Sequence, residues 1–160
     1  MSDGKTHSVL FVGLGGQGVV LASGITAMAA FRAGTDVKQS EVHGMAQRGG
    51  SVTSQVRFGE RVYSPLIPRG TADILVAFHT RESVRCRPQL KPGGVVIDPT
   101  LPGAEQELQN KWGNVYMLGV LSKHLPFAQD VWQDTIRAVV PERFLKVNLA
   151  AFERGAAGGA

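Results

Sequence analysis

A glycine-rich turn near the amino terminus is the first feature whose residue types could bind a ligand. Residues 13–18 read GLGGQG and satisfy the pattern G-x-G-x-x-G. Gly13 permits a tight turn, and Gly18 permits close packing of the following helix on its strand. Gly15 and Gly16 leave backbone N–H groups open to a phosphate at the start of that helix. The candidate cofactor-binding residues of this turn are Gly13, Gly15, Gly16, Gln17 and Gly18. The alternative interpretation is a glycine turn without a ligand.

A carboxylate about 20 residues further on would complete a dinucleotide site by binding the ribose hydroxyls. Asp36 begins the second predicted strand, whereas Glu41 follows it and is therefore better placed. Glu41 could equally brace its own loop. We add Glu41 to the candidate cofactor-binding residues, and a free-standing NAD(P)-binding protein is one hypothesis for the chain.

The stretch EVHGMAQRGG at positions 41–50 has no helical or strand periodicity and indicates an ordered loop. A loop at the carboxyl edge of a parallel sheet is a common binding position in α/β proteins. Arg48 could meet a phosphate or a partner carboxylate, with His43 and Gln47 as hydrogen-bond donors. The alternative is that these side chains only hold the loop. The residues of this predicted interface or active-site edge are His43, Gly44, Met45, Gln47, Arg48, Gly49, Gly50 and Ser51.

Other residue types that could do chemistry are sparse. The single cysteine, Cys86, excludes an internal disulfide and a four-thiolate cluster held by this chain alone. No His/Asp constellation accompanies Cys86, so a structural role is favoured over a nucleophilic one. His79 and His124 show no metal-ligand spacing. We therefore predict no catalytic residue and no metal ligand in this chain.

Composition favours an ordinary folded domain. The 160 residues include 43% hydrophobic and 19% charged residues, which is typical of one globular domain and excludes a disordered chain. The net charge is +4, but the arginines are scattered, so neither a nucleic-acid footprint nor a basic tail is indicated. The amino-terminal residues are polar and no apolar stretch is long enough to span a bilayer. We expect a cytoplasmic protein without nucleic-acid or membrane partners.

The elements that must position these residues follow from apolar periodicity. A buried strand at 8–12 precedes the glycine turn, a helix follows, and a strand at 36–40 completes a βαβ unit. Alternation at 52–58, a Gly-Glu turn and a return at 61–63 predict an inserted β-hairpin. Further strands are predicted at 73–78 and 95–98, with a helix at 81–90 between them, and the chain beyond residue 103 is predicted to be helical.

These elements predict a single Rossmann-like three-layer α/β domain with a mostly parallel sheet, a β-hairpin insertion and a helical carboxyl-terminal part. We expect the domain to span residues 1–154. The last residues, 155–160, are rich in glycine and alanine and are predicted to form a flexible tail. No internal repeat or linker divides the chain.

Taken together, GLGGQG and EVHGMAQRGGSV closely resemble the gamma-type domain of the 2-oxoacid:ferredoxin (acceptor) oxidoreductases, which include the pyruvate and ketoisovalerate enzymes. Within that family the second motif looks most like the small beta subunit of the indolepyruvate oxidoreductases. The resemblance continues through residues 56–59, 63–68, 72–78 and 90–94, and returns at 117–119 and 147–153.

The resemblance implies a Rossmann-like fold and a place in an enzyme complex. Such enzymes oxidatively decarboxylate a 2-oxoacid, an aryl pyruvate in the indolepyruvate type, to an acyl-coenzyme A. They use thiamine diphosphate, magnesium and 4Fe-4S clusters, and they reduce ferredoxin or another acceptor. The implied partners are larger subunits that hold these cofactors. This chain would then bind none of them alone, shape the active-site and coenzyme A region, and be inactive in isolation.

The chain departs from the family pattern at residues 103–114, a segment that is longer in relatives. Contacts made by the longer segment are therefore not carried over to this chain. An interaction module without enzyme partners is a third hypothesis.

Overall fold

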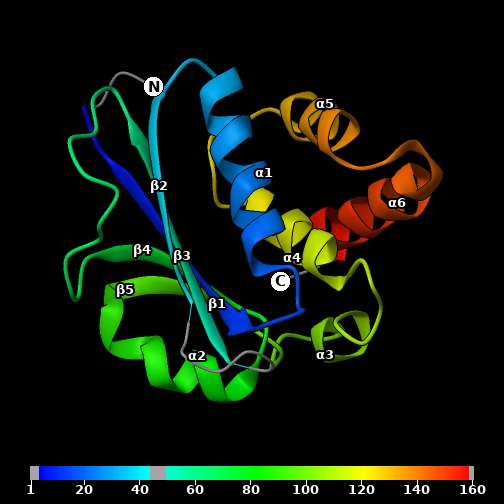
Figure 1. Cartoon of the computed structure of the whole chain (residues 1–160), viewed down its shortest axis with the longest axis horizontal. Helices are drawn as coiled ribbons and strands as arrows, with labels where there is room; N and C mark the ends of the chain where they lie inside the picture. Colours follow the sequence, from blue (N-terminus) through cyan, green and yellow to red (C-terminus); the bar gives the residue numbers. More distant parts are fainter. Residues whose placement is uncertain (1–3, 44–49, 159–160) are drawn as a thin grey trace.

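The computed structural model describes residues 4–43 and 50–158, and their strands form one five-stranded sheet (Figure 1). The strand order is β2-β3-β1-β4-β5. The strands are β1 (His7–Leu14), β2 (Asp36–His43), β3 (Ser51–Gly59), β4 (Ala72–Ala77) and β5 (Leu90–Ile97). The helices are α1 (Val19–Arg32), α2 (Thr80–Cys86), the 3-10 turn η1 (Arg87–Gln89), α3 (Ala104–Glu107), α4 (Gly113–Ser122), α5 (Gln129–Val139) and α6 (Glu142–Gly158).

The direction of β3 distinguishes this sheet from a purely parallel one. β1 pairs in parallel with β4, and β4 pairs in parallel with β5. β3 lies between β1 and β2 and is antiparallel to both, so β2 runs in the same direction as β1. Four of the five strands in the described part of the chain thus share one direction. The prediction of a mostly parallel α/β sheet is confirmed.

The predicted β-hairpin insertion is wrong. Residues 61–63 form no strand, and β3 instead pairs with β1 and β2 along its whole length. Hydrogen bonds from side chains hold the segment that follows β3: the Val62 N–H donates to Asp36 Oδ2 at 2.8 Å, and Arg57 Nη1 donates to the Ser64 carbonyl at 3.1 Å. The alternation at 52–58 was correct, but neighbouring strands occupy both edges of β3, which left no edge for residues 61–63.

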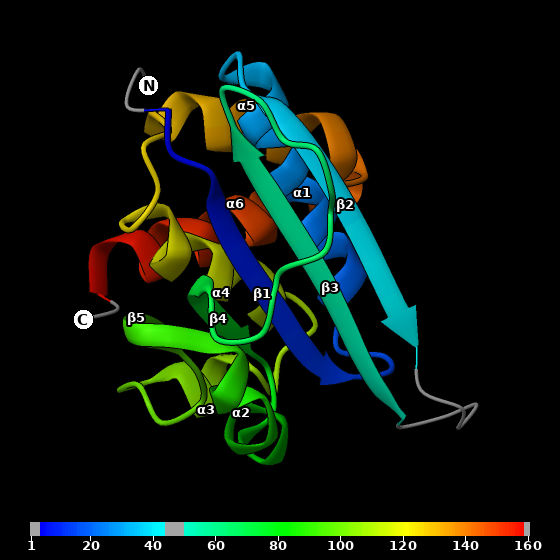
Figure 2. The same ribbon diagram turned by 90° about the vertical axis from the view of Figure 1, so that its left-hand side faces the viewer.

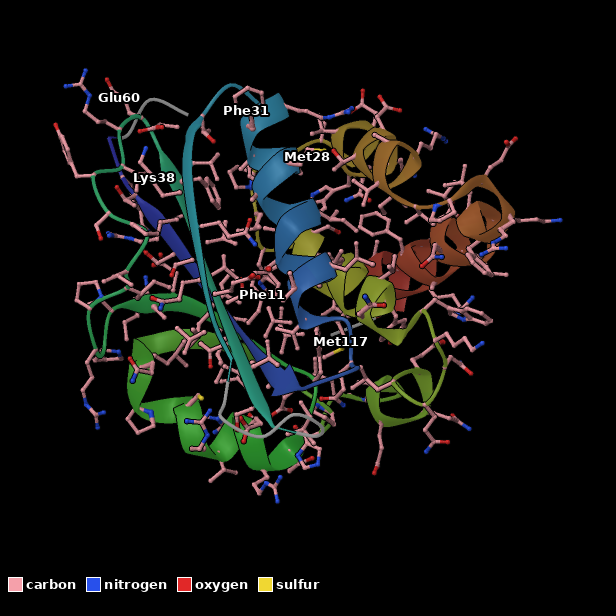
Figure 3. The ribbon with its side chains drawn as sticks, viewed as in Figure 1. Phe11, Met28, Phe31, Lys38, Glu60 and Met117 are labelled. Carbon is pink, nitrogen blue, oxygen red and sulfur yellow. The ribbon has the colours of Figure 1, made fainter. Side chains whose placement is uncertain are left out.

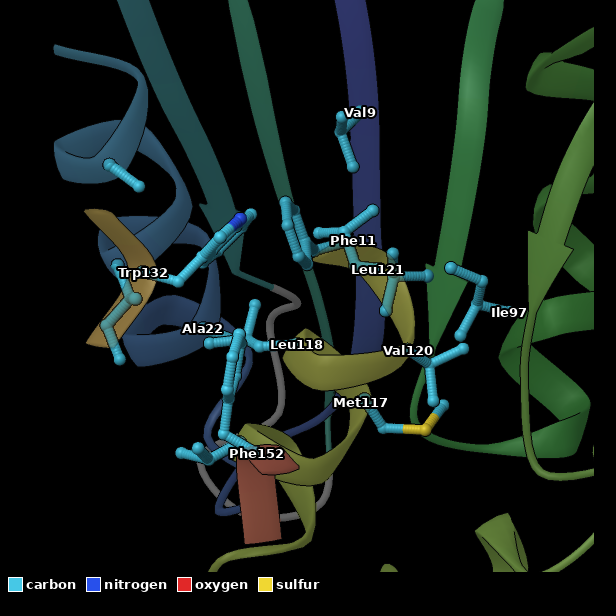
Figure 4. Packing of buried hydrophobic residues seen from close by; sticks show 14 of the residues in the cluster. Val9, Phe11, Ala22, Ile97, Met117, Leu118, Val120, Leu121, Trp132 and Phe152 are labelled. Atoms are coloured by element: carbon cyan, nitrogen blue, oxygen red, sulfur yellow. The ribbon is translucent and has the colours of Figure 1, made fainter. Parts of the chain in front are cut away.

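Helices cover both faces of the sheet, as expected for three layers. α1, α4, α5 and α6 lie on one face, and α2 lies on the other (Figures 1 and 2). The larger of two hydrophobic clusters lies between the sheet and the helices α1, α4, α5 and α6, and it includes Phe11, Leu118, Trp132 and Phe152 (Figure 4). The smaller cluster includes the buried Cys86. Met28 and Phe31 lie on α1 with 40% and 71% of their surface exposed (Figure 3).

The end of the chain also differs from the prediction, because α6 continues through Gly158. Gly155 is buried at the point where α6 crosses α4. A Cβ atom at Gly155 would collide with the Tyr116 carbonyl, and a Cβ atom at Gly119 would collide with the Phe152 carbonyl. The glycines thus let the two helices approach closely. The expected flexible tail at 155–160 is therefore corrected over residues 155–158, where packing overrides the low helix propensity of glycine.

Candidate functional site

The glycine turn joins the carboxyl end of β1 to the amino end of α1. Gly16 and Gly18 adopt left-handed backbone conformations, with φ of +91° and +77°, which favour glycine. A Cβ atom at Gly13 would lie 2.8 Å from Val19 Cγ2 and 2.9 Å from Gln17 Oε1. These positions need glycine for geometric reasons whether or not a ligand binds.

Gln17 braces this turn from within. Its Oε1 atom accepts a hydrogen bond from the Leu14 N–H at 2.7 Å, and its Nε2 atom donates to the Phe78 carbonyl at 2.9 Å. The carboxamide therefore ties the end of β1 to the residue that follows β4. Among the predicted cofactor-binding residues, Gln17 is placed to hold the turn rather than to extend toward a ligand.

A backbone hydrogen bond joins the two sequence motifs. The Gly15 N–H donates to the Gly50 carbonyl at 2.9 Å, which extends the β1–β3 pairing past Leu14 and Ser51. Gly15 and Gly16 are exposed, and no side chain in the described part of the chain caps the amino end of α1. The unsatisfied N–H groups at the start of this 14-residue helix carry partial positive charge. An anionic group is the ligand that this arrangement favours.

A polar hollow of about 250 Å³ opens beside the turn. It is lined by Gly16, Gln17, residues 108–111 and Asn114. Lys111 supplies its one formally charged side chain, which adds to the positive end of α1. Asn114 Nδ2 donates to the Gly18 carbonyl at 3.2 Å, so α4 is fixed directly against the turn. Residues 108–111 and Asn114 belong to the segment 103–114, which is expected from the sequence to be longer in relatives, and they form one wall of the hollow.

An apolar hollow of about 220 Å³ adjoins the polar one, since both are lined by Lys111 and Asn114. Leu21, Trp112, Val140 and Phe144 line this apolar hollow.

The sequence did not identify Lys111 and Asn114 as residues of the site. Only the packing of α4 on α1 brings them to the turn, and no local spacing in the sequence signals this contact.

Glu41 does not lie where a dinucleotide-binding carboxylate would. It belongs to β2, opposite Ser54 of β3, rather than following the strand as predicted. β3 separates β2 from β1, and at about 4.8 Å per strand this places Glu41 roughly 10 Å from β1 across the sheet. In a dinucleotide fold the two strands are adjacent, which lets the acid reach a ribose above the turn.

The motif at 41–52 is described only at its ends. His43 is the last residue of β2 and pairs with Val52. Gly50 contacts the glycine turn, and Ser51 begins β3. The predicted ordered loop, with Gly44, Met45, Gln47, Arg48 and Gly49, lies outside the described residues.

Two acidic side chains of the described residues, Glu82 and Asp98, are buried. The sequence does not single out Glu82 as a buried residue. Glu82, on α2, is 2% exposed and accepts a hydrogen bond from Arg85 Nη2 at 2.8 Å. The hydrogen bond from Arg85 lowers the pKa of Glu82 against the opposing effect of burial. The carboxylate therefore remains ionised at neutral pH.

Asp98, the second carboxylate, follows β5 and is also 2% exposed. It accepts hydrogen bonds from Ser83 Oγ at 2.6 Å and from the Thr100 N–H at 2.9 Å. Burial alone would raise the pKa of Asp98, but these hydrogen bonds and one from Arg87 lower it overall. Asp98 thus holds the turn after β5 to α2.

The side chains that the structure describes do not fit the metal groups that the resemblance implies. One cysteine cannot ligate a 4Fe-4S cluster, which takes four thiolates. Within residues 4–43 and 50–158, no three His, Cys, Asp or Glu side chains gather closely enough to hold a metal ion. No helix in those ranges is long and apolar enough to cross a membrane.

The sheet, the helices on both of its faces and the glycine turn at the carboxyl edge of β1 define a Rossmann-like α/β domain. The chain belongs to the pyruvate ferredoxin/flavodoxin oxidoreductase family, whose sequence profile matches residues 8–112. It is 32% identical to the indolepyruvate oxidoreductase subunit IorB of Thermococcus kodakarensis, over 94% of this chain and 95% of that one. The resemblance found in the two motifs is therefore confirmed.

Solved structures agree with this assignment. The gamma subunit of a keto/oxoacid ferredoxin oxidoreductase from Geobacter sulfurreducens is 26% identical with a TM-score of 0.75, covering 93% of this chain and 95% of that one. The 2-oxoglutarate:ferredoxin oxidoreductase of Magnetococcus marinus is 22% identical with a TM-score of 0.81, covering 96% of this chain but 31% of that one. At this identity the second similarity shows the fold alone.

Length differs between this chain and its Thermococcus relative. Their alignment spans 191 positions, which exceeds the 160 residues of this chain. The relative therefore carries segments that are absent here. That one such segment corresponds to residues 103–114 remains a prediction.

Proposed function

We propose that this chain is the small subunit of an indolepyruvate-type 2-oxoacid:ferredoxin oxidoreductase. The observation that carries the proposal is the similarity to the Thermococcus subunit over nearly the whole length of both chains. The Geobacter gamma subunit supports the same subunit class, because it also matches over nearly the whole of both chains.

The proposed reaction is the oxidative decarboxylation of a 2-oxoacid. The C1–C2 bond breaks and C1 leaves as carbon dioxide. The acyl group joins the sulfur of coenzyme A, which loses its proton, and two electrons pass to ferredoxin or another acceptor. Thiamine diphosphate with magnesium supplies the carbanion chemistry, and 4Fe-4S clusters carry the electrons. Because the donor set of this chain does not fit the clusters, we assign the clusters to larger partner subunits. We propose that the same subunits hold the thiamine diphosphate.

The role that we propose for this chain is to bind an anionic group at the carboxyl edge of its sheet. The uncapped start of α1 and Lys111 surround the polar hollow with positive charge. Phosphate groups of coenzyme A have the charge that this hollow favours. The residues that we propose for the cradle are Gly16 and Gly18, with Lys111 added from the structure. Gly13, Gly15 and Gln17 shape the turn, since the Gly15 N–H and the Gln17 carboxamide are already hydrogen-bonded within the chain. His43, Gly50 and Ser51 lie at the ends of the adjoining motif.

The geometry argues against a free-standing NAD(P)-binding protein. Such a protein needs a carboxylate above the glycine turn, and β3 separates Glu41 from that position. We therefore remove Glu41 from the proposed ligand set. Glu41 is a residue of β2, the outermost strand on that side of the sheet.

Affinity purification of the tagged chain from its source cells tests the proposal. We expect a larger, cysteine-rich subunit with a thiamine diphosphate site to co-purify in stoichiometric amounts. The purified chain alone should be colourless and should not oxidise a 2-oxoacid. Tight NAD(P) binding by the isolated chain, or turnover without a partner, would overturn the proposal.

A further inference from the structure

The outer face of α1 is apolar although it is exposed (Figure 3). Steps of three or four residues place Leu21, Gly24, Met28 and Phe31 in one stripe along the helix. The side chains of Leu21, Met28 and Phe31 are 43%, 40% and 71% exposed. The helix carries no charged residue before Arg32 at its end. A helix that is apolar on all sides is normally buried, so this stripe needs a cover that residues 4–43 and 50–158 do not supply.

The apolar surface continues from α1 onto α6 across the apolar hollow of about 220 Å³. Leu21 of α1 and Phe144 of α6 both line this hollow. Val147, three residues after Phe144, is also exposed. Gly24 leaves room for a close approach, because a Cβ atom there would meet no atom within 4 Å. We call this surface the α1–α6 face, and its apolar residues are Leu21, Met28, Phe31, Phe144 and Val147.

Basic side chains border the α1–α6 face. Lys111 lines the hollow, and none of the described residues that line it is acidic. The guanidinium of Arg143 lies 4.7 Å from the centroid of the Phe144 ring. Arg32 stands at the carboxyl end of the stripe. Methionine, aromatic and arginine side chains are the types that are enriched at protein interfaces, so the composition of this face is that of a docking surface.

We propose that the α1–α6 face is the surface on which the larger subunit docks, through an amphipathic helix whose apolar side chains are flanked by carboxylates. The inference rests on the proposed function, which supplies the larger subunit, and it deepens that function by assigning the surface. A hollow for one large apolar side chain beside an apolar stripe is what a docked amphipathic helix requires. The apolar hollow shares Lys111 and Asn114 with the polar one, so a partner seated here lies next to the proposed anion site.

Charge favours this occupant over a second copy of the chain. Each copy carries a net charge of +4, and basic side chains border the α1–α6 face of each. Two copies docked through this face would therefore bring like charges together. Carboxylates on a partner helix would instead meet Arg32, Lys111 and Arg143, which speeds association and selects the partner.

Calorimetric titration of the full chain with the purified larger subunit tests the apolar part of the face. Met28→Asp places a charge in the middle of the stripe, and we expect it to weaken binding on the order of thirtyfold, as loss of an interface anchor does. Phe31→Ser changes a largely exposed side chain, so it should keep the fold and weaken binding about tenfold. Val84→Asp is the matched control, because Val84 is 66% exposed on α2, which covers the other face of the sheet. It should bind as the wild type does.

The same titration tests the charge of the partner. We expect Arg143→Glu to weaken binding several-fold and to reduce its dependence on salt, because a cation that faces carboxylates is replaced. Arg69→Glu makes the same change of charge in the exposed loop between β3 and β4 and should have little effect. Equal affinities of the Arg143→Glu and Arg69→Glu variants would contradict an acidic partner on this face.

The outcomes separate the docking surface from the proposed function. If the wild type binds the larger subunit and both Met28→Asp and Phe31→Ser bind equally well, the α1–α6 face is not the docking surface, while the proposed function stands. If the wild type does not bind the larger subunit, the proposed function itself fails. Sedimentation of the isolated chain tests the other occupant. A concentration-dependent dimer that Met28→Asp abolishes would assign the face to a second copy and overturn the proposal.

Discussion

The Gly15 N–H lies 2.9 Å from the Gly50 carbonyl oxygen, and this hydrogen bond joins the glycine turn to the end of the second motif. The two motifs are distant in sequence but form one edge of the sheet because β3 pairs directly with β1. The polar hollow lies beside this edge, next to the start of α1.

Lys111 should contribute to binding of an anionic ligand in that hollow. We expect Lys111→Met to raise the KM for coenzyme A by about tenfold in the complex, because one charge-assisted contact contributes about 1.5 kcal/mol. The matched control is Lys146→Met, since Lys146 is exposed on α6 and does not line the hollow. Steady-state kinetics with varied coenzyme A measure the effect. Equal KM values for both variants would contradict the proposed cradle.

Close packing of α4 on α6 should depend on the glycines at their crossing. We expect Gly155→Ala to lower the free energy of unfolding by about 2 kcal/mol or more, because the added methyl group collides with the Tyr116 carbonyl. Gly158→Ala meets no neighbouring atom within 4 Å and should be neutral or slightly stabilising. Urea unfolding measures both variants. Comparable stabilities for Gly155→Ala and the wild type would show that the crossing tolerates a side chain.

Acid should destabilise the protein through its buried carboxylates. The pKa of Asp98 is lowered from its ordinary value of 3.8, and that of Glu82 from 4.5. The unfolded chain therefore binds more protons than the folded one as the pH falls through this range. The stability that these groups contribute is complete above their ordinary pKa values and is lost below them.

Asp98→Asn should be less stable than the wild type at pH 7, and its stability should fall less steeply between about pH 5 and pH 3. Urea unfolding across this pH range measures the two slopes. An equally steep loss in the variant would exclude Asp98 as a source of the acid sensitivity.

Cys86 should be unreactive in the folded protein. The side chain is buried among Leu10, Val12 and Leu75, and burial raises the pKa of its thiol although Arg85 opposes this effect. Because the thiolate is the reactive form, we expect iodoacetamide to label the native chain much more slowly than the urea-unfolded chain. Similar labelling rates in both states would contradict the burial of Cys86.

The sequence was sufficient for features that depend on local pattern. The apolar run before GLGGQG predicted β1 and the start of α1, and the run at 73–78 predicted β4. Periodicity could not show that β3 lies between β1 and β2, because alternation within a strand does not identify its neighbours. For this reason Glu41 was assigned to a ribose site that the sheet order does not form.

Other features depended on tertiary contacts. Asn114 reaches Gly18 only through the packing of α4 on α1, and α6 extends to Gly158 only because Gly155 packs on α4. Glu82 resembles an ordinary exposed acid of the first turn of α2, since nothing in its local sequence indicates that it is buried.

Turnover by the reconstituted complex tests the central claim most directly. Indolepyruvate, coenzyme A and oxidised ferredoxin are supplied to this chain, to its co-purified larger subunit and to the two together, and reduction of ferredoxin is followed. We predict reduction that depends on coenzyme A only when both subunits are present. Equal reduction by the larger subunit without this chain, or no reduction by the pair with indolepyruvate, would contradict the account.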